Sequence, residues 1–129
     1  MDSISIKSFN KVVLVNDKEL ILNFDDNGFL KKFIELFDKA KLVYEYNKNV
    51  NVDEEKIKLI NDMSDGIDDL FGENSCFNLF GCKYPNLTIL TEFVSFMAPY
   101  ANEFSKNSSD RIEKISEKYN ANRIGDSDV

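Results

Sequence analysis

Apolar residues recur with two different periods along this chain, and the change of period predicts where strands give way to helices. In residues 4–24 apolar and polar residues tend to alternate, and the pair Asn16-Asp17 interrupts the alternation. Alternation with a period of two is typical of half-buried strands, and Asn-Asp is a common turn pair. We therefore predict a β-hairpin over residues 4–24, and Ile4 and Ile6 extend the pattern toward a third short strand segment.

From residue 26 onward the apolar residues recur every three to four positions, which is the period of an amphipathic helix. The pattern stops at residues 47–49, at Gly72, at Gly81 and again before Pro85. Acidic or polar residues precede each long apolar stripe, as expected where a helix begins. The pattern predicts three long helices and one short helix, at residues 26–47, 53–71, 74–80 and 87–104.

The end of the chain carries a weaker helical pattern. Pro99 has no backbone N–H to donate to the carbonyl of residue 95, so we expect the third long helix to bend or stop there. The polar run 105–109 predicts a break, and a weakly apolar tail helix over 109–120 follows it. Residues 121–129 are polar and rich in small residues, which predicts a flexible tail.

The triplet Leu-Phe-Gly occurs twice within residues 67–82. Glycine adopts the positive φ that ends a helix without a steric clash at Cβ, so Gly72 and Gly81 predict a corner between helices. We expect Phe71 and Phe80 to pack inward and fix that corner. Gly66, inside the preceding helix, predicts a kink or a close approach by another helix.

The sequence also predicts whether Phe77, Cys76 and Cys82 of this region are buried. Phe77 lies three positions before Phe80, so we expect both rings to face the core. Cys76 and Cys82 are expected to be free, buried thiols beside the corner, since no histidine or further cysteine completes a zinc site.

Together these elements predict an α+β fold that is mostly helical. The N-terminal β-hairpin packs on a bundle of three long helices, and the short helix forms the Leu-Phe-Gly corner. The chain has 129 residues, of which 43% are hydrophobic and eleven are phenylalanine. This length and composition suit one core, so we expect a single globular domain over residues 1–120.

Charge and composition disfavour several classes of function. The net charge of −7 opposes binding to nucleic acid or to anionic membranes. Histidine is absent, which removes the commonest general base and transition-metal ligand. The acidic segment 62–68 only loosely imitates a calcium loop and lies within a helical pattern. We therefore expect a cytoplasmic protein with no catalytic residues, no metal and no cofactor.

Several short motifs resemble a known family. They are Ile67-Asp68-Asp69-Leu70-Phe71-Gly72-Glu73, Leu79-Phe80-Gly81, a helix with Phe93 and Phe96, and Tyr119-Asn120-Ala121-Asn122-Arg123. Together with the N-terminal hairpin and first helix, this pattern resembles tail assembly chaperones of phages and prophages from low-GC Gram-positive bacteria. Asn74 departs from the family pattern, which has a glycine there, but asparagine tolerates the left-handed conformation.

The resemblance implies a non-enzymatic protein that binds the tape measure protein and the tail tube protein during tail assembly in the bacterial host. The alternatives are a structural tail or baseplate component that stays in the finished particle and, more remotely, a regulator of a host protein. Homo-oligomer formation is also open. The apolar stripes of the last helices fit either the core or a protein-binding surface, and the residues that we assign to the surface are Phe93, Phe96, Met97, Tyr100, Ile112, Ile115 and Tyr119.

Overall fold

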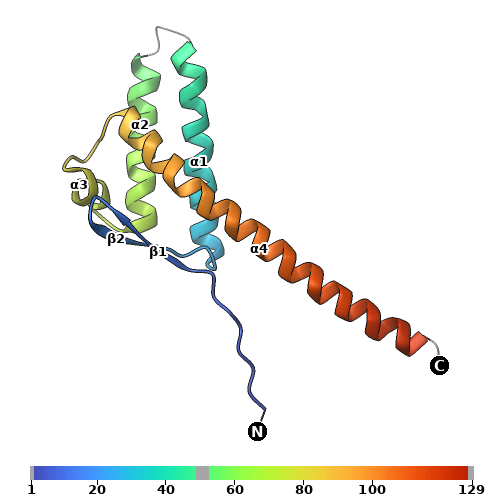
Figure 1. Ribbon diagram of the computed structural model, residues 1–129. Helices are drawn as coiled ribbons and strands as arrows, with labels where there is room; N and C mark the ends of the chain where they lie inside the picture. Colours follow the sequence, from blue (N-terminus) through green and yellow to red (C-terminus); the bar gives the residue numbers. More distant parts are fainter. Residues whose placement is uncertain (1, 49–52, 128–129) are drawn as a thin grey trace. The chain divides into compact units, whose positions relative to one another are not determined.

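The computed structural model describes residues 2–48 and 53–127, and it has the predicted mostly helical α+β fold (Figure 1). A two-stranded antiparallel hairpin comes first and four helices follow it. The elements in chain order are β1 (Lys11–Val15), β2 (Lys18–Leu22), α1 (Asn27–Lys48), α2 (Asp53–Phe71), α3 (Ser75–Phe80) and α4 (Leu87–Ser127).

The hairpin turns where the sequence predicted. Val13 pairs with Leu20, and both side chains are buried on the inner face. Asn16 and Asp17 occupy the turn with φ of 51° and 65°. A two-residue turn with positive φ at both positions matches the right-handed twist of the flanking strands, and Asn and Asp tolerate this conformation.

The hairpin is shorter than residues 4–24, because residues 2–10 form no strand. Ile4 and Ile6 are exposed, so the expected third strand segment is wrong. The chain is instead held just before β1, where the Ser8 hydroxyl and the Phe9 N–H donate to Asp25 Oδ2 at 2.7 and 2.9 Å. Alternation alone does not make a strand when no partner strand pairs with it.

Local signals set the starts of the long helices. The Asp26 carboxylate accepts the Gly28 N–H at 2.8 Å at the start of α1, and the Asn86 side chain accepts the Ile89 N–H at 3.0 Å at the start of α4. Both contacts satisfy N–H groups that the helix itself leaves unpaired. Gly66 lies where α2 meets α1, since a Cβ at this position would lie 3.5 Å from Leu36 Cδ1. The predicted close approach of another helix is therefore confirmed.

The Leu-Phe-Gly corner has the predicted backbone. Gly72 and Gly81 have φ of 111° and 80°, and Asn74 has φ of 65°. The Ser75 hydroxyl donates to the Gly72 carbonyl at 2.6 Å, which closes the turn before α3. The Cys76 N–H donates to Asp68 Oδ1 at 2.9 Å and ties the start of α3 back to α2.

Two side chains of this corner differ from expectation. Phe77 is 57% exposed and Cys82 is exposed, so neither is buried as predicted. α3 has only six residues, and its inward face holds Cys76 and Leu79. Phe77 follows Cys76 by about 100° around the helix, so it turns away from the core. Cys82 lies beyond the end of α3, and both cysteines are free.

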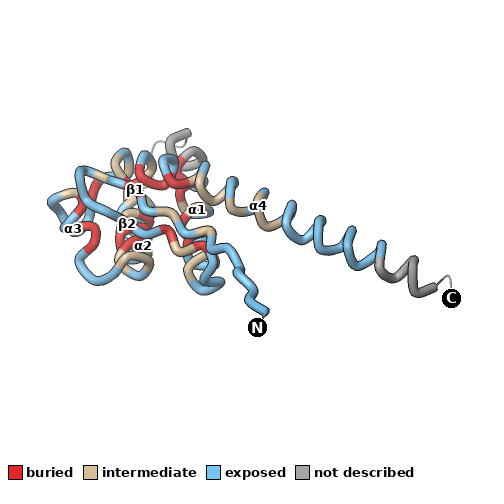
Figure 2. Tube along the Cα trace, turned by 60° about the horizontal axis from the view of Figure 1, so that its bottom comes forward, coloured by how far each residue is buried: buried red, intermediate tan, exposed pale blue. Residues whose placement is uncertain are grey.

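The core is joined by edge-to-face aromatic contacts. Phe93 of α4 contacts Phe71 and Phe80 with ring centroids 6.0 and 5.5 Å apart, which confirms both corner phenylalanines as inward-packing residues. Phe71 also contacts Phe29, and Phe29 contacts Phe24, at 5.8 and 5.7 Å. Figure 2 shows the buried residues gathered in the strands, α1–α3 and the beginning of α4.

The chain divides into two compact units, Met1–Ala98 and Pro99–Val129, whereas the sequence predicted a single globular domain over residues 1–120. α4 runs through this boundary without the predicted stop at Pro99 or break at 105–109. Proline removes one backbone hydrogen bond, and the polar residues after it are compatible with a helix. The expected flexible tail is helical to Ser127, and residues 128–129 lie outside the described part.

No helix in the described part of the chain is long and apolar enough to cross a membrane.

Candidate protein-binding surface

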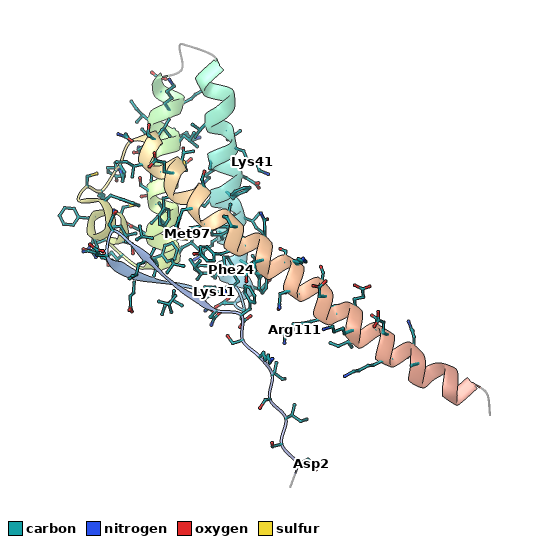
Figure 3. The ribbon with its side chains drawn as sticks, in the orientation of Figure 1. Asp2, Lys11, Phe24, Lys41, Met97 and Arg111 are labelled. Carbon is teal, nitrogen blue, oxygen red and sulfur yellow. The ribbon has the colours of Figure 1, made fainter. Side chains whose placement is uncertain are left out.

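The structure separates the seven predicted surface residues into buried and exposed groups. Phe93 and Met97 are buried, and Met97 has no exposed surface. Figure 3 shows Met97 among the side chains of the packed core. Assigning these two residues to a protein-binding surface is therefore wrong. Phe93 and Met97 lie on one edge of the wide apolar stripe of α4, and this edge faces the core of the first unit. There the Phe93 ring contacts both Phe71 and Phe80.

Phe96 lies on the other edge of the same stripe and is 49% exposed. It lines two grooves of the first unit and therefore lies between them. We call this side chain the Phe96 ridge. The groove on the hairpin side, with a volume of about 420 Å³, runs between residues 14–16 and Ile89. The groove on the α1 side, with a volume of about 590 Å³, reaches Val43. An aromatic ridge between two open grooves can contact apolar side chains of a partner.

The outer face of the hairpin adds apolar area that sequence analysis missed. Val12, Leu14 and Ile21 are all exposed there. The turn is held in place because the Asn16 side-chain N–H donates to the Leu79 carbonyl at 2.8 Å. The signal in the sequence was the unbroken apolar run of residues 12–15, since a strand with one polar face alternates instead.

The second unit presents the remaining predicted residues on one helix. Ile112, Ile115 and Tyr119 are 63%, 65% and 63% exposed. Their spacing of three and four residues places them on one side of α4, and we call them the tail stripe. Tyr100 is partly buried, at the beginning of this unit. The structure therefore exposes Phe96 and the tail stripe, which belong to different units.

The Cys76 thiol is a poor nucleophile. Burial, followed by the nearby Asp68 carboxylate, raises the pKa of the Cys76 thiol from 9.0 to about 12. The thiol donates to the Ser64 carbonyl at 3.5 Å. A thiol with so high a pKa holds its proton at neutral pH, and only the thiolate is a good nucleophile or metal ligand.

The acidic segment that loosely imitates a calcium loop is helical. Residues 62–68 lie within α2 rather than in a loop, and the Asp68 carboxylate accepts the Cys76 N–H. Among the described residues, no group of three or more His, Cys, Asp or Glu side chains could hold a metal ion.

Comparison with known proteins gives a family for the chain. Residues 16–125 match a family of unknown function, DUF6673, and this match covers most of the chain. The protein belongs to this family. No curated protein and no solved structure matches it. The matched range includes β2, all four helices except the last residues of α4, and both the Phe96 ridge and the tail stripe.

Proposed function

We propose that this DUF6673 protein is a phage tail assembly chaperone, which binds the tape measure protein, the tail tube protein or both in the cytoplasm of the bacterial host. The proposal rests on the family resemblance of the Leu-Phe-Gly corner and the C-terminal helix. The structural observation that carries it is the tail stripe, whose three large apolar side chains are all about two-thirds exposed.

A stripe of this kind suits temporary binding to another helix. Three apolar side chains at helical spacing fit into a groove, or alongside a second amphipathic helix. Full burial of one such side chain contributes about 1.5–3 kcal/mol, and association has its own entropic cost. A stripe of three residues therefore supports a contact that can be broken again, as a chaperone requires when its client assembles.

The Phe96 ridge supplies a second contact area on the first unit. The ring and the two grooves beside it are apolar enough to accept side chains of a partner, and Glu92 lines both grooves. Two modest surfaces on one chain can hold an extended client more tightly than either surface alone, when both reach it at the same time. This combination fits a long, extended partner such as a tape measure protein.

The proposal is tested by affinity capture from a phage-producing host that expresses the tagged full-length protein. Wild type should recover the tape measure or tail tube protein, identified by mass spectrometry. The variant I112E/I115E should lose them, because it places two charges in the contact. I57E is the matched control, since Ile57 is similarly exposed but lies on α2. Recovery of neither protein by abundant wild type would refute the proposal.

A second measurement distinguishes an assembly chaperone from a structural component that stays in the finished particle. Purified particles should lack this protein if it is an assembly chaperone, because a chaperone leaves before the tail is complete. Its presence in particles at a fixed ratio to the tail tube protein would instead identify a structural tail or baseplate component.

A further inference from the structure

The basic residues that border the tail stripe and the acidic residues near it lie on different sides of α4. Arg111 precedes Ile115 by four residues and Lys118 follows it by three, so both basic residues border the stripe at Ile115. They are seven residues apart, which places them along the same edge about 10 Å from each other. Figure 3 labels Arg111, which projects from α4. We call Arg111 and Lys118 the basic edge.

The basic edge has no acidic neighbour on its own helix. The positions three and four residues away from Arg111 are Asn107, Ser108, Lys114 and Ile115. For Lys118 they are Lys114, Ile115, Ala121 and Asn122. Only residues at this spacing face each other on a helix, so neither side chain has a carboxylate to pair with there.

Lys106 and Lys114, the other two basic residues within 99–121, are placed differently. Lys106 has Glu103 three residues before it and Asp110 four residues after it. Lys114 has Asp110 four residues before it and Glu117 three residues after it. The acidic residues Asp110, Glu113 and Glu117 are themselves spaced by three and four, so they form a separate acidic edge away from the stripe. Within residues 99–121, the basic residues with no carboxylate three or four positions away are therefore the two that border the tail stripe.

We propose that the tail stripe and the basic edge together recognise an amphipathic helix of another protein whose apolar face is bordered by Asp or Glu. Carboxylates spaced by seven residues on that helix would meet Arg111 and Lys118, in the way that flanking charges select partners in coiled coils. This inference rests on the proposed function, because it assigns the chemistry of the client segment that the tail stripe contacts.

Charge also argues against two other occupants of this surface. An antiparallel pair of two copies would bring Arg111 of one chain beside Lys118 of the other, and like charges repel. A membrane surface requires net positive charge, whereas residues 99–121 contain four basic and four acidic residues, which cancel. The residues counted are Lys106, Arg111, Lys114 and Lys118, and Glu103, Asp110, Glu113 and Glu117.

The test uses the full-length protein and two synthetic helical peptides with the same apolar stripe. One peptide carries Glu, and the other Lys, at seven-residue intervals beside the stripe. Binding is followed by fluorescence anisotropy at low and moderate salt. Wild type should bind the Glu peptide at least about 10-fold more tightly than the Lys peptide, and the difference should shrink with added salt.

Charge-reversal variants provide the decisive comparison. R111E/K118E should reverse the preference and bind the Lys peptide more tightly, which also shows that the variant is folded. K31E/K58E changes the net charge by the same amount at two exposed lysines of α1 and α2, away from the basic edge, and should keep the wild-type preference. Equal binding of both peptides, no binding of either, or reversal by K31E/K58E as well would overturn the proposal.

Two further results would assign the surface to another occupant and so overturn the proposal. One is self-association in light scattering that R111E/K118E abolishes. The other is co-sedimentation with anionic phospholipid vesicles that the same variant abolishes. Failure of the proposed function is distinguishable: a Glu-peptide preference without capture of tail proteins refutes the function alone, and capture without a peptide preference refutes this inference alone.

Discussion

Phe93 connects α4 to the Leu-Phe-Gly corner, because its ring contacts both Phe71 and Phe80. Replacing it by alanine removes both edge-to-face contacts and leaves a cavity, so F93A should lower the free energy of unfolding by about 3–5 kcal/mol. F77A is the matched control, since Phe77 is exposed and its loss should change stability by about 0.5 kcal/mol or less. Urea denaturation followed by circular dichroism measures both, and equal losses would contradict the assignment of Phe93 to the core.

The two cysteines should differ sharply in reactivity. Cys82 is exposed, whereas Cys76 is buried and its pKa is raised to about 12 by burial and by Asp68. A disulfide reagent such as DTNB should therefore modify one thiol quickly in the native protein at pH 8, and the second only after unfolding. C82S should remove the fast phase. A fast phase that persists in C82S would show that Cys76 is accessible.

The same thiol makes stability depend on pH in the alkaline range. The folded pKa of Cys76 lies above its ordinary value of 9.0, so the folded state binds the proton more tightly than the unfolded state does. The stability from this group is full below about pH 9 and is lost as pH rises toward 12. The free energy of unfolding should fall less steeply in C76A than in wild type over this range. Parallel slopes would remove Cys76 as the cause.

At the scale of elements, two glycines should respond in opposite ways to alanine. Gly66 lies inside α2, and an added Cβ would meet only Leu36 Cδ1 at 3.5 Å, which is ordinary contact. G66A should therefore raise the free energy of unfolding by about 0.5–1 kcal/mol through helix propensity. Gly81 ends α3 with φ of 80° and open space around it, so G81A should lower stability by about 1 kcal/mol through backbone strain alone. Thermal denaturation of both variants checks the signs.

The elements that sequence predicted well are those set by neighbouring residues. α2 begins at Asp53 and ends at Phe71 as expected, because the acidic first turn and Gly72 are local signals. The segment at Ile4 failed because strand pairing depends on a distant partner, and the break at 105–109 failed because polar residues do not by themselves end a helix. A helix stop needs a terminal signal, and Pro99 removes only one hydrogen bond.

The candidate surface was harder to predict for a related reason. The sequence shows that the apolar stripe of α4 is wide, but it does not show which edge the first unit covers. Met97 and Phe96 are adjacent in sequence and differ completely in exposure, since only Met97 faces the core. The tail stripe was easier, because Ile112, Ile115 and Tyr119 are the apolar residues within 105–119, and a helix with so narrow an apolar face is mostly exposed.

At the scale of the whole molecule, stability and partner binding should be separable. Every buried hydrophobic residue among those described lies between Val13 and Met97, within the first unit. A chain ending at Lys106 keeps that entire core and loses the tail stripe and the basic edge. Its first unit should therefore unfold within about 1 kcal/mol of the full-length protein, because exposed helical residues contribute little burial.

Binding should respond to the same truncation in the opposite way. The chain ending at Lys106 should fail to capture tail proteins and should no longer distinguish Glu-bordered from Lys-bordered peptides, while its Phe96 ridge remains intact. Circular dichroism and urea denaturation measure the stability of the first unit, and affinity capture with mass spectrometry measures binding. Undiminished capture by the truncated chain would move the partner contact to the Phe96 ridge and the outer face of the hairpin. Loss of stability together with binding would mean that the second unit supports the fold of the first.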